Sequence, residues 1–217
     1  MLPFALKKKK ADGYTILCLG AHCDDIEIGC GGTIIKWLKE HKDTTVHWIV
    51  FSKDKIREGE ARKSAGLFLR GAKGKKVVVK DFRNGFFPYI GTEIKEYFEK
   101  LKNEVNPDII FTHYRQDLHQ DHRLLSDLTW NTFRNHLILE YEIPKYDGDF
   151  SSPNLYIPLE EEICRKKVET VTNVFKSQKS KHWFTKDLFR AILRLRGMEA
   201  GNGARFAEGF YCRKLSL

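Results

Sequence analysis

The feature that most constrains the fold of this chain is a regular alternation of short apolar runs with amphipathic segments over about its first 135 residues. The apolar runs are rich in β-branched and aromatic residues, as strands are, and lie at 14–22 (YTILCLGAH), 44–52 (TTVHWIVFS), 75–82 (KKVVVKDF) and 107–113 (PDIIFTH). The segments that follow them carry apolar residues at helical spacing and lie at 31–42, 57–71, 92–105 and 121–137. Strands that alternate with helices form βαβ units. The sequence therefore predicts an α/β, Rossmann-like fold, with a mainly parallel sheet and helices on both of its faces.

The last third of the chain is less regular. Residues 137–159 contain two candidate strands around a loop rich in Pro, Gly and Ser, and 160–178 and 186–201 are predicted helices. No repeat or clear linker is apparent in the sequence. A chain of 217 residues is long enough for one substantial domain. We therefore expect a single domain over 1–217, with 1–12 as a flexible basic N-terminal segment.

Basic residues outnumber acidic ones, with 38 Lys and Arg against 29 Asp and Glu and a net charge of +9. Such an excess favours anionic partners. It does not choose among a phosphorylated small molecule, a nucleic acid and an acidic membrane surface.

Two further features indicate a cytoplasmic protein. No apolar stretch approaches the roughly 20 residues that span a bilayer, and the chain start does not read as a secretory signal. The five cysteines form no CxxC pair and are odd in number, which favours reduced thiols over a disulfide framework. The sequence does not determine the oligomeric state, and an oligomer is compatible with it.

The concentrated polar chemistry of the sequence lies in two motifs, AHCDD at 21–25 and HQDH at 119–122. Each motif follows a predicted strand, and ligands of parallel sheets bind outside the carboxyl ends of the strands. Together the motifs offer two imidazoles and a carboxylate, which is a ligand set for a catalytic zinc with one open position. Each half alone has a plainer reading, since Asp-Asp after a strand suits Mg²⁺ and HQDH suits a helix start.

The two motifs resemble those of the PIG-L (LmbE-like) metal-dependent N-deacetylases, whose members carry A-H-P-D-D after the first strand and H-x-D-H after a later one. EIGCGGT at 27–33, shortly after the first motif, and RGMEAGNGARFAEGFY near the chain end are also similar to segments of that family. The resemblance implies that His22, Asp25 and His122 bind the metal. It also implies that Asp24 is the general base and His119 stabilises the oxyanion. Asp121 is implied as the carboxylate that orients and charges His119.

The resemblance also implies a substrate-binding arginine after the second strand, which is Arg57. Pairing of Arg57 with Glu58 or Glu60 on the surface is the alternative. Asp81 and Arg83, after the third strand, are further substrate candidates.

The chain departs from the family pattern at two positions. Cys23 replaces a usual proline, and we expect its thiol to point into packing rather than to bind the metal. Asp117 stands where some members place a catalytic tyrosine, a role that Tyr114 could supply. Outside the motifs, His113 is predicted to be a hydrogen-bonded structural histidine, and Glu208 to act indirectly, through groups around the site. The glycines of GCGGT are predicted to turn the backbone sharply and to pack closely, in preference to binding a phosphate.

The resemblance implies a hydrolase that removes the acetyl group from an N-acetylglucosamine-type sugar and releases acetate. Its cofactor would be Zn²⁺, with Fe²⁺ or another divalent metal as alternatives. Its partner would be an N-acetyl amino sugar, as a small molecule or a glycoconjugate, and the positive charge favours an anionic one such as a sugar nucleotide. A metal-dependent phosphoesterase and a non-catalytic nucleotide- or nucleic-acid-binding module remain alternatives, and no nucleic-acid partner is expected for the hydrolase.

Overall fold

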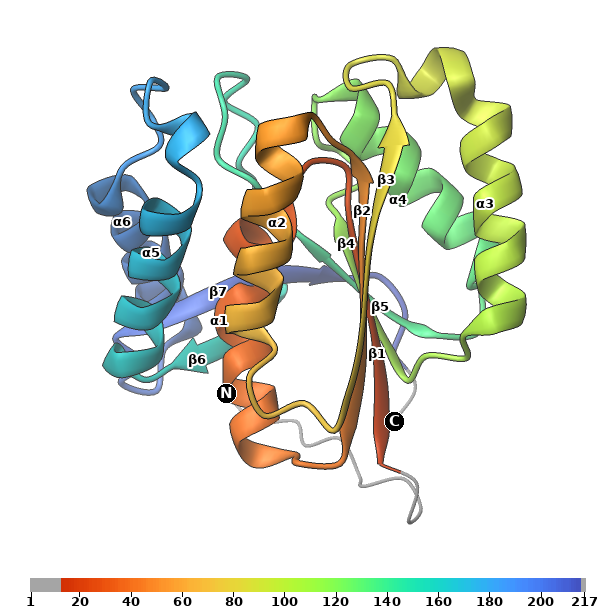
Figure 1. The fold of residues 1–217 in the computed structure, drawn as a ribbon. Helices are drawn as coiled ribbons and strands as arrows, with labels where there is room; N and C mark the ends of the chain where they lie inside the picture. The colour runs from red at the N-terminus through yellow and green to blue at the C-terminus, as the bar shows by residue number, and fades with distance from the viewer. Residues whose placement is uncertain (1–12, 216–217) are drawn as a thin grey trace.

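The computed structural model describes residues 13–215, so the predicted flexible segment 1–12 lies outside the described residues. The strands form one seven-stranded sheet in the order β3-β2-β1-β4-β5-β7-β6 (Figure 1). Strands β1 to β5 run parallel, and β7 runs antiparallel to both β5 and β6. The strands are β1 (Tyr14–Gly20), β2 (Thr44–Ser52), β3 (Gly74–Phe82), β4 (Ile109–His113), β5 (Leu137–Tyr141), β6 (Leu155–Leu159) and β7 (Phe206–Cys212). The predicted α/β, mainly parallel sheet is confirmed.

Helices cover both faces of this sheet, as predicted. Helices α1, α2, α5 and α6 lie on one face, and α3 and α4 lie on the other (Figure 1). The helices are α1 (Asp25–Glu40), α2 (Lys55–Phe68), α3 (Gly91–Glu104), α4 (Gln120–Thr132), α5 (Glu161–Val174) and α6 (Lys186–Ala200), with short 3-10 turns η1 (Phe87–Ile90) and η2 (Lys176–Gln178). None of the described helices is long and apolar enough to cross a membrane.

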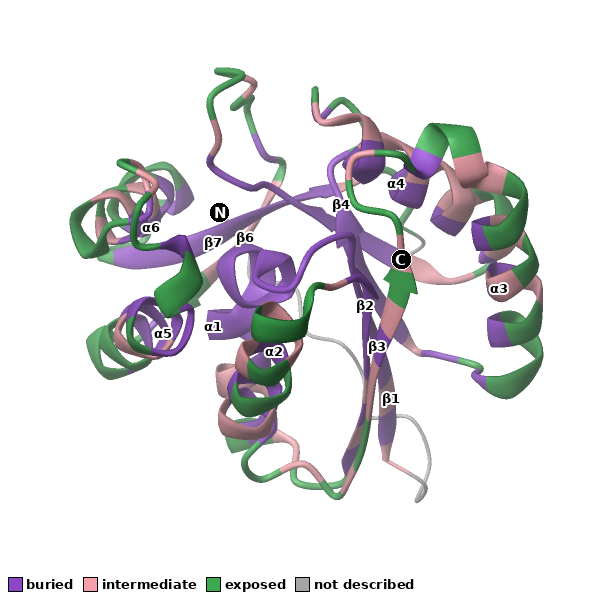
Figure 2. Ribbon diagram, turned by 45° about the horizontal axis from the view of Figure 1, so that its top comes forward, coloured by how far each residue is buried: buried purple, intermediate pink, exposed green. Residues whose placement is uncertain are grey.

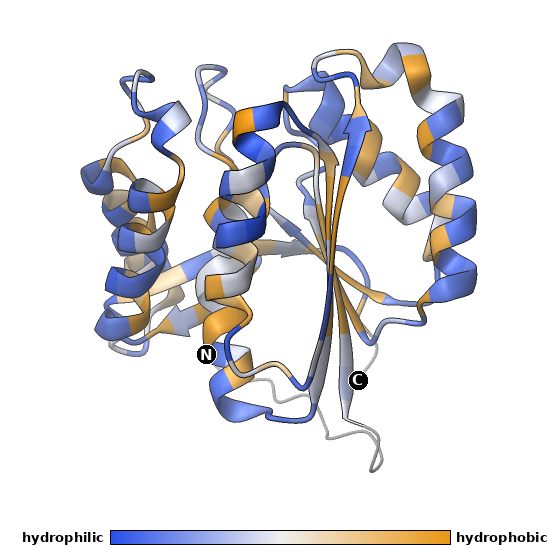
Figure 3. Ribbon diagram, viewed as in Figure 1, coloured by the Kyte–Doolittle hydropathy of each residue, from blue (hydrophilic) through white to orange (hydrophobic). Residues whose placement is uncertain are grey.

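The central strands are buried on both faces because each face packs against helices. Successive side chains of a strand point to opposite faces, so Ile16 and Cys18 enter the core under α1 and α2, whereas Leu17 and Leu19 enter the core under α3 and α4. Figure 2 shows the buried inner strands, and Figure 3 shows that hydrophilic and hydrophobic residues alternate along the helices that cover them. Two cores therefore hold the carboxyl ends of β1 and β4 in place.

Helix α1 begins at Asp25, earlier than predicted, so the sharp turn expected at the glycines is wrong. Gly29, Gly31 and Gly32 lie inside the helix, which is buried along this part. A Cβ on Gly29 would lie 2.1 Å from the Tyr141 ring, and one on Gly31 would lie 2.5 Å from Phe68. The close packing predicted for the glycines is therefore confirmed, but it serves helix contacts rather than a turn.

Strand β7 was not predicted, and it carries Glu208. This buried carboxylate accepts hydrogen bonds from the backbone N–H groups of Gly32 and Thr33 in α1 and from the Lys167 ammonium of α5. Lys167 also donates to the Ile28 carbonyl. The contacts of Glu208 thus go to the middle of α1 rather than to the residues of the two motifs, and its predicted indirect role stays a prediction.

Candidate metal centre

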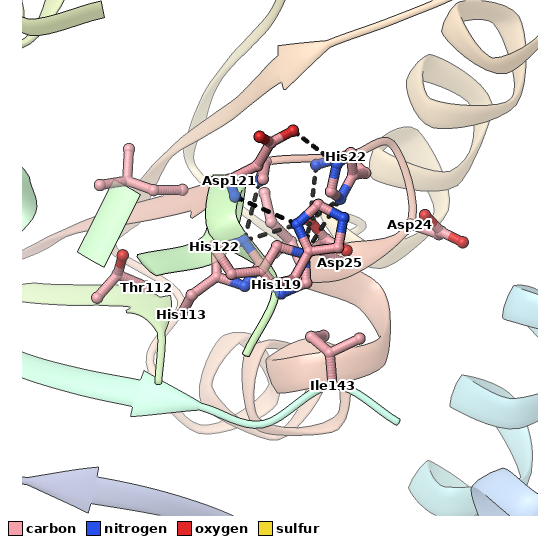
Figure 4. Close-up of polar contacts among 12 residues, drawn as sticks. His22, Asp24, Asp25, Thr112, His113, His119, Asp121, His122 and Ile143 are labelled. Carbon is pink, nitrogen blue, oxygen red and sulfur yellow. Dashed lines mark hydrogen bonds and ion pairs between the residues drawn. The ribbon is translucent and has the colours of Figure 1, made fainter. Parts of the chain in front are cut away.

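The two sequence motifs meet because β1 and β4 are neighbours in the sheet. His22 lies in the turn after β1, and Asp25 is the first residue of α1. His119 caps the N-terminus of α4, and His122 lies in the first turn of that helix. Parallel strands end at the same edge, so these side chains converge into one cluster (Figure 4).

Three donor atoms of this cluster are spaced as the ligands of one cation would be. The His22 Nδ1 atom lies 3.1 Å from His122 Nε2 and 3.3 Å from Asp25 Oδ2. The His122 Nε2 atom lies 3.6 Å from the same Asp25 oxygen. Tetrahedral ligands about 2.0–2.2 Å from zinc are separated from one another by roughly 3.3–3.6 Å. The predicted ligand set therefore fits a divalent metal.

Two further carboxylates hold the imidazoles in orientation. The Nδ1 of His122 donates to Asp117 Oδ2 at 2.9 Å, which leaves Nε2 free to offer its lone pair to the cluster. The Nε2 of His22 lies 3.4 Å from Asp121 Oδ2, which leaves Nδ1 facing the cluster. Sequence reasoning treated Asp117 only as a departure from the family pattern. Its position between the end of β4 and His122 was the signal for a carboxylate within reach of that imidazole.

The charges of the cluster suit a cation. Burial raises the pKa of Asp25, but His122, His22 and His113 together hold it well below its usual range. Burial lowers the pKa of His22, but Asp25 and Asp121 outweigh it and raise the pKa to about 9. Burial and the neighbouring His113 lower the pKa of His122 to about 3. A proton on His22 thus balances the carboxylates, and a metal ion would displace that proton.

His113 is fully buried beside the cluster, and its ring stacks on His122 with centroids 3.9 Å apart. Its Nε2 accepts a hydrogen bond from the Ala21 N–H at 3.0 Å, so this lone pair is already engaged. The same atom lies 3.2 Å from Asp25 Oδ2. Asp25, His113 and His122 form one alternative group of closely spaced donors, and His22, His119 and His122 form another. The engaged lone pair favours the structural role that the sequence predicted.

His119 and Asp121 are close together, but not in the predicted way. The Asp121 carboxylate accepts from the backbone N–H groups of Gly85 and Phe87 and faces His22, and it makes no described contact with the His119 ring. Instead, the Asp121 backbone N–H donates to His119 Nδ1 at 3.2 Å. Nδ1 is then unprotonated, so the proton of the neutral ring lies on Nε2. Burial and His22 lower the pKa of His119, which favours this neutral donor over the charged one expected.

A general base is expected to have an unpaired carboxylate, but the carboxylate of Asp24 is paired. Its carboxylate accepts a hydrogen bond from Arg57 Nη2 at 2.5 Å and points away from the imidazoles (Figure 4). Arg57 therefore pairs with neither Glu58 nor Glu60 in the described contacts. Burial raises the pKa of Asp24, although Arg57 lowers it. A raised pKa suits a group that must accept a proton near neutral pH.

Cys23 and Tyr114 turn away from the centre. The Cys23 thiol is buried in the core and donates to the Ser52 carbonyl, and burial raises its pKa to about 12. This confirms the predicted packing role. The Tyr114 hydroxyl donates to Gln116, and its ring stacks on Tyr211 at 3.7 Å. No described contact brings Tyr114 to the cluster as a substitute catalytic tyrosine.

The remaining substrate candidates lie at the same edge of the sheet. Asp81 and Arg83 are exposed where β3 ends, and Arg83 stacks on the Phe86 ring with its guanidinium carbon 3.5 Å from the ring centre. Neither side chain contacts the cluster directly in the described structure.

A Rossmann-like sheet with a buried His/Asp cluster at the carboxyl ends of β1 and β4 defines an α/β protein with a candidate metal centre at that cluster. The family model described as PIG-L, GlcNAc-PI de-N-acetylase, matches residues 17–133, which is more than half of the chain and includes both motifs. The protein belongs to the PIG-L family.

Solved structures share the fold over nearly the whole chain. N,N'-diacetylchitobiose deacetylase from Pyrococcus horikoshii, in complex with an inhibitor, has a TM-score of 0.64 and 21% identity and covers 93% of this chain and 84% of its own. The zinc-inhibited form of teicoplanin deacetylase Orf2 has a TM-score of 0.68 and 12% identity, over 91% and 97% of the two chains. GalB, the 4-carboxy-2-hydroxymuconate hydratase from Pseudomonas putida, has a TM-score of 0.74 and 15% identity, over 94% and 98%. At these identities the likeness shows the fold alone, and one of the proteins that share the fold is a hydratase.

Proposed function

We propose that this protein is a metal-dependent hydrolase that removes the acetyl group from an N-acetylglucosamine-type sugar and releases acetate. The observation that carries the proposal is the spacing of the donor atoms of His22, Asp25 and His122, which lie 3.1–3.6 Å from one another at the carboxyl ends of β1 and β4. The family match supports an acetamide as the substrate group. A phosphoesterase or a pure binding module has no comparable support.

His22, Asp25 and His122 would hold the metal, with Zn²⁺ as the proposed ion. A divalent ion at such a site acts as a Lewis acid and lowers the pKa of water toward about 7. Asp117 keeps the His122 ring oriented, and Asp121 does the same for His22. The buried carboxylates and rings around these ligands also limit the access of bulk water.

Asp24 is the proposed general base, and His119 the proposed donor to the oxyanion. To accept a proton from the attacking water, the Asp24 carboxylate must leave Arg57 and turn toward the cluster. Arg57 is then free to bind the substrate. Its side chain would thus pair with Asp24 in one state, as observed, and contact the substrate in the other, as predicted from the sequence. Because its Nδ1 accepts from the Asp121 amide, His119 can donate from Nε2 to the oxygen of the acetamide as charge develops there. Asp24 then returns its proton to the departing amine.

The test is acetate release. Metal-loaded protein is incubated with a panel of N-acetylated monosaccharides, oligosaccharides and sugar nucleotides, and loss of acetyl is followed by mass spectrometry. We expect at least one amino sugar product, and a fall of metal content and activity together in His122→Ala. Binding of nucleotides with a steep salt dependence and no acetate from any substrate would instead indicate the binding module.

A further inference from the structure

We propose that a cavity between the last turn of α4 and the segment after β7 is a second binding site, which takes a small organic phosphate monoester. The cavity has a volume of about 300 Å³, and its lining residues are Arg115, Trp130, Asn131, Arg134 and Lys214. Ligand pockets in proteins span about 300–1,000 Å³, so the cavity is large enough for such a molecule. This inference goes beyond the proposed deacetylase function and does not depend on it.

The cavity is separate from the metal centre, although helix α4 reaches both. His122 lies in the first turn of α4, and Trp130 lies near its end. At 1.5 Å per residue, the two positions are about 12 Å apart along the helix axis. Among the described residues, none of those that line the cavity belongs to the groups of closely spaced His and Asp donors. A ligand in the cavity would therefore leave the metal centre unoccupied.

A buried carboxylate holds the walls of the cavity in place. Glu140 of β5 has no exposed surface, and its Oε1 accepts hydrogen bonds from Trp130 Nε1 and Arg213 Nε, each at 2.6 Å. Its Oε2 accepts from the Arg115 backbone N–H at 2.9 Å. Three segments that are distant in sequence thus meet at one side chain. Walls that are fixed before binding reduce the entropy that a ligand loses when it binds.

Two of the cations that line the cavity are not neutralised by an acid. Within residues 13–215, no carboxylate lies within ion-pair distance of Arg134 or Lys214, whereas the third cation, Arg115, pairs with Asp127 at 2.8 Å. Arg134 Nε donates to the Asn131 carbonyl, and Lys214 Nζ donates to the Arg134 carbonyl. The other N–H groups of both exposed side chains remain available to a ligand. Two positive charges match a phosphate monoester, which carries about −1.5 to −2 at pH 7.

The indole of Trp130 gives the same cavity an apolar wall. Its ring is half-buried, and the hydrogen bond to Glu140 fixes its orientation. An aromatic ring packs well against a ring of a ligand, and a guanidinium plane can stack on such a ring too. A phosphate joined to a ring therefore fits the cavity better than inorganic phosphate does.

This cavity also gives a place for the anionic partner that the net charge of +9 favours. The charge alone does not choose among a phosphorylated small molecule, a nucleic acid and an acidic membrane surface. Binding of nucleic acid uses a patch or stripe of many Lys and Arg side chains. A hollow with two unpaired cations instead offers contacts to a single phosphate group, so the small molecule is the partner that fits.

The experiment measures binding of phenyl phosphate, inorganic phosphate and phenol by isothermal titration calorimetry. The protein is stripped of metal and then dialysed free of the chelator, so that the metal centre does not contribute. We expect phenyl phosphate to bind more tightly than either fragment. Arg134→Gln and Lys214→Gln should each raise its Kd roughly 12- to 160-fold, the equivalent of about 1.5–3 kcal/mol for a hydrogen bond to a charged group. Lys63→Gln, at an exposed position on α2, is the control of equal charge and should leave the Kd unchanged.

A second measurement tests whether the ligand lies where we place it. In NMR spectra of the ¹⁵N-labelled protein, phenyl phosphate should shift the indole N–H signal of Trp130, which Trp130→Phe identifies by its loss. No binding of phenyl phosphate, or equal Kd values in Arg134→Gln, Lys214→Gln and the wild type, would overturn the site. Equal affinity for inorganic phosphate would overturn the contact with Trp130 and hence the monoester. Tighter binding of an oligonucleotide that is lost in the same two variants would overturn the small molecule in favour of nucleic acid.

Discussion

Asp24 and Asp25 are adjacent residues of one type, but their carboxylates lie in different surroundings. Asp25 Oδ2 faces His22 and His122, whereas Asp24 points to Arg57. Asp25→Ala should therefore lose metal and activity together. Asp24→Asn keeps the three ligands, so it should bind metal normally, but its rate should fall about 10²–10⁴-fold because the amide cannot accept a proton. Metal content by atomic emission and acetate release check both variants, and near-normal turnover in Asp24→Asn would contradict the assignment of the base.

Asp117 provides a second residue-scale test, because its carboxylate contacts His122, a proposed metal ligand, and is not itself in the proposed ligand set. Burial raises its pKa, but the hydrogen bond from His122 and the Lys145 ammonium hold the pKa below its usual range. Asp117→Asn should weaken metal binding roughly 10- to 100-fold, as loss of such partners of ligating histidines does. Competition with a fluorescent chelator measures this affinity. Asp127→Asn is the control, because Asp127 is a half-exposed acid on α4 that pairs with Arg115. Equal affinity in both variants would remove Asp117 from the centre.

At the residue scale, the sequence predicted which histidine and aspartate side chains lie together, but not which side chains they contact. The spacing of His22, Asp25 and His122 after two strands was enough to bring them together. The Arg57–Asp24 pair and the contact of Asp121 with Gly85 depend on side-chain directions across separate loops. Those directions are set by tertiary packing and leave no periodic signal in the sequence.

At the scale of the element, α1 depends on its glycines for contact with β5. A Cβ on Gly29 would lie 2.1 Å from Tyr141, whose hydroxyl is held by the Leu19 carbonyl at 2.6 Å, so the ring cannot simply move aside. Gly29→Ala should lower the unfolding free energy by about 1–3 kcal/mol, or roughly 2–12 °C in Tm for a chain of this size.

The control for this helix test is Gly59→Ala in α2, where an added Cβ meets nothing within 4 Å. There the helix propensity of alanine should raise stability by about 0.5–1 kcal/mol. Thermal unfolding by circular dichroism measures both variants. A Gly29→Ala protein at least as stable as Gly59→Ala would show that α1 does not pack as described.

Element boundaries were predicted less well than element types, for reasons visible in α1 and β7. Glycines usually end or interrupt helices, so EIGCGG was read as a turn, although burial against Tyr141 and Phe68 keeps it helical. Strand β7 follows a glycine-rich turn and pairs with β5 and β6 from distant parts of the chain. Because β7 pairs antiparallel with strands far away in the sequence, it is not part of a βαβ alternation, and that alternation was the signal that predicted β1 to β4.

At the scale of the whole molecule, a fully buried acid outside the ligand set makes stability depend on pH. Glu27 has no exposed surface, and burial raises its pKa well above its usual range, more than the Ser64 hydroxyl lowers it. The folded state therefore holds this proton more tightly than the unfolded state, whose glutamate titrates near pH 4.3 or so. The contribution of this proton to the unfolding free energy is fully present below that pH, where both states are protonated. It is lost progressively as the pH rises toward the pKa of the folded state.

Glu27→Gln removes this titration while it keeps the shape of the side chain. The variant therefore tests how Glu27 makes the unfolding free energy of the whole molecule depend on pH. The difference in unfolding free energy, variant minus wild type, should become more positive between pH 5 and pH 8, by at most about 1.4 kcal/mol for each pH unit. Urea unfolding at several pH values, with EDTA present so that metal binding does not contribute, measures this slope. Glu162→Gln, at an exposed site on α5, shows the effect of the same substitution without burial. A Glu27→Gln difference that does not vary with pH would mean that Glu27 is ionised in the folded protein, and that a buried positive charge must then compensate it.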